Sequence, residues 1–495
     1  MPNPMDVLRI AGPLLLIYFL GASILAFFRI RFSKDPLAYP GWALGTGALG
    51  TGFLIFAWLW FRPQTATALI PDLLVGGAML LFFILSKLKE ARTRKPTHPL
   101  TPKLGTPPSV GIRFERGIFV LVVLFVVALV LLRIASASLE PMVAGDEAGI
   151  WSQKAKVLWL SGGFNQRYPR LLDFWPTPQK DYPLLNPLLQ VFEFANWGRI
   201  TLIANRLPFQ ALSLATIFVL AAGLRKRLRP SLAALILLMV SSWRLFAWDS
   251  FEGDGEVLMV LGSVMALDSW LRYRLDSDSS ILPLLAIGLS LLAWGKNEAL
   301  MIGAALMIAA LLLSFLHILR KKPIARPSKA LFALVPPILI FALNRTVNTH
   351  FGFESPWARD PRGTLLDFFV NQISSYSPIV LRFFWEEIFF YAKHSGYVGI
   401  ALLLWILTFP RKTLGEWTIT FPALALLGTW LATICVFIAT PAEVKWHLLT
   451  AAKRVAFQTM PACALLLAAA VDKTVPALGP WKPAFPPDRV ELELP

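Results

Sequence analysis

The stretch VAGDEAGIWSQKAKVLWLSGGF, Val143 to Phe164, follows the hydrophobic segment 117–136 and carries adjacent carboxylates at Asp146 and Glu147. Beyond this pair, apolar residues recur at helical spacing, while polar residues such as Lys154 occupy the other face. This pattern is typical of a helix that lies in the membrane interface. The stretch therefore predicts a membrane span that opens into a polar loop. Asp146 then has two interpretations, a reactive carboxylate or a helix N-cap.

The composition predicts a polytopic membrane protein. The chain has 495 residues, of which 56% are hydrophobic and 16% charged, and its mean hydropathy is +0.60. Its net charge of +17 comes largely from short basic blocks between apolar segments. Membrane topology and anionic lipid explain such blocks, whereas no soluble basic domain is present to bind nucleic acid.

The hydropathy pattern predicts an all-α fold with about thirteen transmembrane helices, at about 20 apolar residues per crossing. The predicted spans are residues 8–28, 41–61, 66–85, 117–136, 204–223, 231–248, 254–271, 281–295, 298–318, 331–348, 396–409, 419–438 and 456–471.

The basic linker 86–116 fixes the predicted orientation of the chain, because positively charged loops stay in the cytoplasm. Alternation then places the basic loops 225–229 and 320–329 inside as well. The loops assigned outside include 137–203, 349–395 and 440–455, and the outer loops hold most of the acids. Polar groups are costly at membrane depth, so their concentration on one side indicates a functional face there.

The turn around Asp254 and Glu256 lies at the outer mouth of a predicted span. Its carboxylates could ligate a divalent cation together with Asp146, or they could stabilise the positive end of the helix dipole. The sequence does not require a cofactor, but these carboxylates could bind a divalent cation.

Two outer segments offer positive charge. Lys296 and Glu298 interrupt a long apolar run, and either form an ion pair in a tight turn or present Lys296 to a phosphate. In the last outer loop, His447 and Arg454 share one helical face. They either bind phosphate or belong to a basic interfacial helix.

Several motifs together resemble the GT-C superfamily of polytopic glycosyltransferases, in the branch of the protein mannosyltransferases and the bacterial lipid A aminoarabinose transferase. They are, in order, GDE at 145–147, DYPLL at 181–185, GDGEVLMVLGSVMALDSW at 253–270, LLAWGKNEAL at 291–300 and WHLLTAAKRVAFQTMP at 446–461. The resemblance covers residues 117–471. The family often has two prolines after the tyrosine of DYPLL, and here only one follows.

The resemblance implies transfer of a sugar from a polyprenyl-phosphate donor to a lipid, glycan or protein acceptor. Asp146 matches the catalytic carboxylate, with Glu147 beside it. Candidates for binding the donor phosphate are Lys296, His447, Arg454 and Lys154, and candidates for the substrate cleft are Tyr182, Asp254 and Glu298. The enzyme would lie in the inner (plasma) membrane with its site on the periplasmic or extracellular side.

The sequence thus divides into an N-terminal three-helix extension (1–85), the basic linker (86–116), the catalytic domain (117–471) and a cytoplasmic tail (472–495). The extension has no counterpart in the family. The alternative function is a flippase or exporter of lipid-linked glycans. It predicts internal repeats or charged residues along several spans, and the sequence shows few of these.

Overall fold

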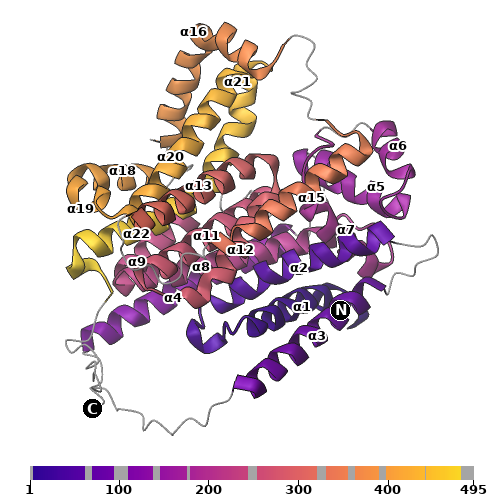
Figure 1. The fold of residues 1–495 in the computed structure, drawn as a ribbon, viewed down its shortest axis with the longest axis horizontal. Helices are drawn as coiled ribbons and strands as arrows, with labels where there is room; N and C mark the ends of the chain where they lie inside the picture. Colours follow the sequence, from indigo (N-terminus) through magenta and orange to yellow (C-terminus); the bar gives the residue numbers. More distant parts are fainter. Residues whose placement is uncertain are drawn as a thin grey trace.

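The structure, a computed structural model, describes residues 4–61, 70–93, 110–137, 145–175, 179–242, 254–319, 331–354, 363–389, 397–440 and 442–480. All regular elements in these ranges are helices, which confirms the predicted all-α class for this part of the chain. Figure 1 shows most of them packed into one bundle, from which α16 and α21 extend.

The helices of the first half of the chain are α1 Pro4–Phe27, α2 Tyr39–Phe61, α3 Ile70–Thr93, α4 Val110–Ala137, α5 Gln153–Ser161, α6 Arg167–Phe174, α7 Leu185–Trp197, α8 Leu207–Arg227 and α9 Pro230–Ser241. Those of the second half are α11 Glu256–Leu275, α12 Leu282–Gly295, α13 Asn297–Leu319, α15 Val335–Phe351, α16 Leu365–Phe383, α18 Val398–Thr408, α19 Pro410–Leu414, α20 Trp417–Ile438, α21 Val444–His447 and α22 Lys453–Thr474. Short π-helical segments precede α5 at Glu147–Ser152 and α22 at Leu448–Ala452.

A helix coincides with each of the thirteen predicted spans, but the count of thirteen crossings is not confirmed. Five helices of the described chain are long and apolar enough to cross a membrane: Tyr39–Phe61, Ile70–Ala91, Gly111–Ser136, Ala204–Arg227 and Trp417–Ile438. A bent pair, Val444–Ala452 with Phe457–Thr474, makes six if it is one span. Others, such as α9 and α18, have the composition of spans but only 12 and 11 residues. These features are consistent with a membrane protein.

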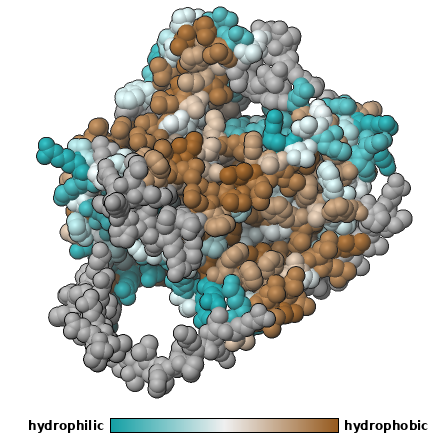
Figure 2. Space-filling view, in the orientation of Figure 1, coloured by the Kyte–Doolittle hydropathy of each residue, from teal (hydrophilic) through white to brown (hydrophobic). Residues whose placement is uncertain are grey.

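Helix α11 lies at the centre of the bundle. Its side chains are buried from Glu256 to Tyr273, and it contacts α8, α12 and α22. It begins at Glu256, which belongs to the candidate active site described below, and runs to the opposite end of the molecule. Figure 2 shows a broad hydrophobic surface over α13, α15 and α3, with hydrophilic side chains gathered near α5 and α6 and at the opposite edge. This distribution is typical of a protein surrounded by lipid across its middle.

The first two helices of the N-terminal extension pack very closely on each other, and α2 packs on the rest of the bundle. Helix α1 contacts α2 and α3, and α2 contacts α8. A Cβ atom added at Gly47 would lie 1.8 Å from the carbonyl oxygen of Ile17, and one at Gly21 would lie 1.8 Å from that of Ala43. Only glycine lets the backbones of α1 and α2 approach so closely.

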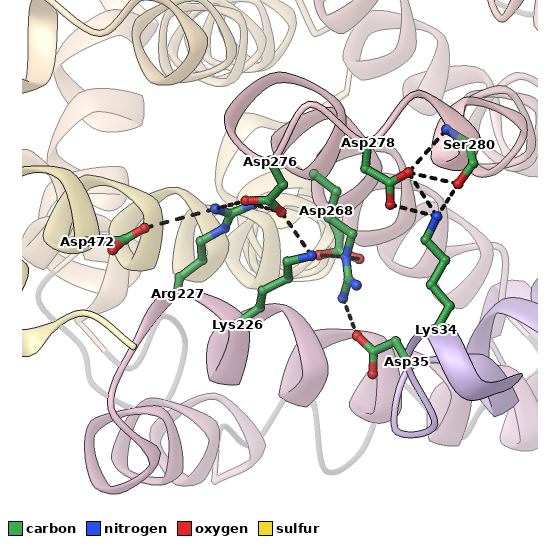
Figure 3. Close-up of polar contacts among 10 residues, drawn as sticks. Lys34, Asp35, Lys226, Arg227, Asp268, Asp276, Asp278, Ser280 and Asp472 are labelled. Atoms are coloured by element: carbon green, nitrogen blue, oxygen red, sulfur yellow. Dashed lines mark hydrogen bonds and ion pairs between the residues drawn. The ribbon is translucent and has the colours of Figure 1, made fainter. Parts of the chain in front are cut away.

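A network of ion pairs joins the loop between α1 and α2 to the ends of α8 and α11 (Figure 3). Arg272, which is buried, pairs with Asp35 at 2.7 Å and with Asp268 at 2.8 Å. Lys34 pairs with Asp278 at 2.7 Å, and Arg227 with Asp276 at 2.8 Å. The network therefore fixes the extension to the rest of the bundle at the end opposite the candidate site.

Replacing Arg272 by glutamine is expected to destabilise the protein by about 3–5 kcal/mol, because it leaves the buried carboxylate of Asp268 without its cation. The control is Lys226→Gln, since Lys226 is partly exposed and Arg227 remains beside the shared partner Asp276. That change should cost less than about 1 kcal/mol. Thermal unfolding in detergent measures both. Equal effects would show that burial of Arg272 does not matter.

Candidate active site

Asp146 lies immediately before the π-helical turn Glu147–Ser152, and its side chain is partly exposed. Its side chain is 35% exposed, and its Oδ2 lies 2.7 Å from Nη1 of Arg454. It makes no side-chain capping hydrogen bond. The N-cap interpretation of Asp146 is therefore not what the structure shows.

Glu147 points into a different environment. It is buried, and Arg206 donates to both of its carboxylate oxygens, with a distance of 2.6 Å between Nε and Oε1. A bidentate pair of this kind fixes both side chains. The adjacent acids thus separate into Asp146, which is reachable, and Glu147, which joins the π-helical turn to the start of α8.

Arg454, in the first turn of α22, lies at the centre of the candidate site. Besides Asp146, its Nη1 lies 3.4 Å from Asp254 and 3.9 Å from Glu256, two carboxylates that are almost completely buried. Its Nε donates to the carbonyl oxygen of Thr450. The side chain of Arg454 is 23% exposed, so part of it is open to a ligand.

Lys296 extends the same cluster. It lies in extended conformation between α12 and α13, where its Nζ is 2.7 Å from Glu256 and 3.8 Å from Glu298. Burial disfavours the charged ammonium, but Glu256 and Glu298 outweigh this effect and raise the pKa of Lys296. The predicted ion pair with Glu298 is present, although Glu256 is the nearer partner.

Tyr182 completes one side of the cluster. Its hydroxyl donates to Oε1 of Glu298 at 2.7 Å, and its ring packs on Trp151 at 5.4 Å between centroids. Burial first, and the neighbouring Glu298 second, raise the pKa of Tyr182 well above its usual value. The phenol is therefore a hydrogen-bond donor at neutral pH.

Lys154 positions this loop. It is fully buried, and its Nζ donates to the carbonyl oxygens of Lys180 at 2.9 Å and Tyr182 at 2.6 Å. Asn297 donates to the Asp181 carboxylate, and Asn348 to the Asp181 carbonyl. Lys154 thus holds the loop that carries Tyr182, and it has no exposed surface on which to meet a phosphate, contrary to its predicted donor-binding role.

Burial lowers the pKa of Lys154 to about 7, although Asp181 partly opposes the shift. The unfolded chain binds the proton up to its ordinary pKa of about 10.4, so unfolding takes up a proton between pH 7 and 10. We expect the free energy of unfolding to rise with pH in this window by about 1.4 kcal/mol per unit. Thermal unfolding of Lys154→Met across this window should lack that slope, and an unchanged slope would contradict the assignment.

His447 lies beside the cluster but contacts other groups. Its Nδ1 is 2.8 Å from the hydroxyl of Thr440, and its ring lies 4.6 Å from that of Phe437. The π-helical segment Leu448–Ala452 separates it from Arg454. Of the four predicted phosphate ligands, Arg454 and Lys296 form ion pairs within the cluster of carboxylates, whereas His447 contacts Thr440 and Lys154 contacts two loop carbonyl groups.

The charges of the cluster bear on which ligand it can hold. Four carboxylates (Asp146, Asp254, Glu256 and Glu298) surround two cations (Lys296 and Arg454). The guanidinium of Arg454 occupies the space among the first three carboxylates. In the described part of the chain no group of three or more His, Cys, Asp or Glu side chains is arranged to hold a metal ion. Of the two cations, Arg454 is the more exposed, at 23% of its side chain against 6% for Lys296.

A small cavity adjoins the cluster through Glu298. Residues of α13, α20 and α22 line it, and they are Glu298, Met301, Ile302, Thr429, Trp430, Thr433, Gln458 and Thr459. The cavity carries hydroxyl, amide and carboxylate groups as well as an indole ring. It therefore places hydrogen-bonding groups next to the charged cluster.

Sequence reasoning missed several contacts. The sequence suggests a cation ligand or a helix-dipole residue at Glu256, whereas the structure shows it as the nearest partner of Lys296. The sequence did contain a signal for this pair. Glu256 begins α11 and Lys296 follows α12, so both were predicted on the same side of the membrane. The pair of Glu147 with Arg206 had a similar signal, since Arg206 stands at the start of a predicted span.

Comparison with known proteins identifies no relative. No protein-family model matches the chain, and neither a curated protein nor a solved structure shows significant similarity to it. The contacts among the described residues are therefore the basis for inferring a function.

Proposed function

We propose that the protein is a membrane glycosyltransferase of the GT-C type. It transfers a sugar from a polyprenyl-phosphate donor to a lipid, glycan or protein acceptor at the non-cytoplasmic face of the plasma membrane. One observation carries this proposal. Asp146, a partly exposed carboxylate of the first large loop, lies 2.7 Å from Nη1 of Arg454, a partly exposed residue at the start of α22.

The reaction needs a base for the acceptor and positive charge for the leaving group. In the proposed mechanism Asp146 accepts the proton of the acceptor hydroxyl while the oxygen attacks the anomeric carbon. The bond from this carbon to the phosphate oxygen breaks, and polyprenyl phosphate leaves with the bonding electrons. Direct displacement inverts the anomeric centre.

Arg454 is the proposed partner of the leaving phosphate. Its Nη1 lies 2.7 Å from Asp146, 3.4 Å from Asp254 and 3.9 Å from Glu256, and its side chain is partly exposed. Lys296 lies behind Glu256 and has little exposed surface. We therefore assign phosphate contact to Arg454 and a positioning role, through Glu256, to Lys296. No metal ion takes part in this scheme.

Deleting the protein and comparing the masses of envelope glycans and lipids tests the proposal. A transferase predicts the loss of one sugar unit from an envelope component, together with accumulation of the polyprenyl-phosphate sugar outside the cytoplasm. A flippase or exporter instead predicts accumulation of a lipid-linked glycan on the cytoplasmic side. That second outcome would contradict the proposed function.

A further inference from the structure

A second polar feature lies at the other end of the molecule, between the end of α1 and the end of α3. An open hollow of about 420 Å³ is lined there by Ala26, Arg29, Arg31, Phe83, Ser86, Lys87 and Glu90. Helices α2 and α11 separate it from the candidate active site, since each begins or ends near one feature and runs to the other. This end is the one that the basic linker predicts to be cytoplasmic.

The lining of this hollow is basic. Three cations surround a single acid, Glu90, which lies 3.3 Å from Arg31 and 3.5 Å from Lys87. Arg29 has no hydrogen-bond or ion-pair partner for its side chain among the described residues. One carboxylate cannot satisfy three cations, so the hollow has donors to offer to an anion.

The backbone at Arg29 adds an independent observation. Arg29 follows α1 with a φ of +64°, and the hydrogen bonds from Arg29 to Ala26 and from Ile30 to Leu25 close the end of the helix. Glycine usually occupies such a left-handed position, because a Cβ atom is unfavourable there. A guanidinium is thus kept at the edge of the hollow at a cost in backbone energy.

The apolar surroundings indicate what kind of anion fits. Helix α3 packs on the bundle along one side only, and just 17% of its apolar window is buried. Its exposed residues include Leu80, Leu81 and Ile84, and this surface leads to Phe83 at the wall of the hollow. Hydrocarbon chains could lie along α3 while a charged headgroup reaches the cations.

We infer that this hollow binds the phosphate of an anionic membrane lipid, with the acyl chains lying along α3. Basic pockets between membrane helices recognise lipid phosphates through the same combination of cations and apolar wall. The inference assigns a binding site to the N-terminal extension. It does not depend on the proposed transferase activity.

The test uses the full-length protein in detergent, titrated with phosphatidylglycerol, with phosphatidylcholine and with inorganic phosphate, and bound lipid is counted by native mass spectrometry. Each basic residue near a lipid phosphate contributes about a fivefold change in affinity. The double variant Arg31→Gln/Lys87→Gln should therefore bind phosphatidylglycerol about twentyfold more weakly. The matched control Arg225→Gln/Arg411→Gln removes two exposed cations elsewhere and should bind normally.

Two further variants separate a lipid site from a structural feature. Glu90→Gln removes the acid and should strengthen binding of phosphatidylglycerol several-fold. Arg29→Gly should raise the melting temperature by relieving the left-handed backbone, yet weaken binding about fivefold. A purely structural Arg29 would not give these opposite signs.

Three outcomes would overturn the inference. They are equal binding of phosphatidylglycerol and phosphatidylcholine, unchanged binding by Arg31→Gln/Lys87→Gln, and saturation by inorganic phosphate at the concentrations at which the lipid binds. The last would indicate a site for free phosphate and not for a lipid.

Discussion

Asp146→Asn is expected to lower sugar transfer by about 10²- to 10⁴-fold, the usual contribution of a general base. Asparagine keeps the size of the side chain but cannot take the proton of an acceptor hydroxyl. Because Asp146 is partly exposed, losing its pair with Arg454 should cost less than about 1 kcal/mol of stability. The rate at which a deletion strain regains its modified envelope glycan, normalised to protein amount, measures the effect.

Asp173→Asn is the matched control for this prediction. Asp173 belongs to α6 in the same loop and also pairs with a cation, Lys180, but it lies outside the charged cluster. This variant should restore the glycan at the wild-type rate. Equal rates for Asp146→Asn and wild type would show that Asp146 does not act as the base.

Arg454→Gln is expected to lower both the stability of the protein and its rate of sugar transfer, and these effects are the second largest that we predict. Removing the guanidinium leaves the nearly buried carboxylates of Asp254 and Glu256 less compensated, which should cost about 3–5 kcal/mol of stability. It also removes the donors proposed for the leaving phosphate, and a lost donor of this type lowers rates by about 10²- to 10³-fold. Thermal unfolding and transfer rate are measured on the same preparation.

A second substitution separates the two effects of Arg454. Adding Asp254→Asn to Arg454→Gln removes one of the uncompensated charges, so stability should partly return while transfer stays low. Arg382→Gln is the surface control, because Arg382 and Glu386 form an exposed pair. If transfer recovered together with stability, Arg454 would have a structural role only.

The sequence predicted where helices form but not which of them cross the membrane. Apolar residues that face other helices have the same hydropathy as those that face lipid. Helices α12 and α11 show the difficulty, since both are buried among other helices along most of their length. Composition therefore identifies a buried helix and a span equally well, and only packing distinguishes them.

The candidate site was predictable only in part, because the sequence indicates the side of the membrane on which a residue lies but not the direction of its side chain. The sidedness of the loops placed Asp146, Lys296 and Arg454 on one face, and the structure brings them into one connected cluster. The partners within that cluster depend on how side chains point. Lys154 illustrates this, because its charge suggested a phosphate ligand, whereas its Nζ is directed at two loop carbonyl groups.

The central claim is that this cluster removes a sugar from a polyprenyl phosphate. The most direct measurement places purified protein in vesicles with membrane extract from the deletion strain, and follows release of polyprenyl phosphate and the mass of the acceptor. The account predicts that wild type releases polyprenyl phosphate as an acceptor gains one sugar, and that Asp146→Asn does so at least about a hundredfold more slowly. Wild-type protein that releases none, or an Asp146→Asn variant that keeps pace with it, would contradict the account.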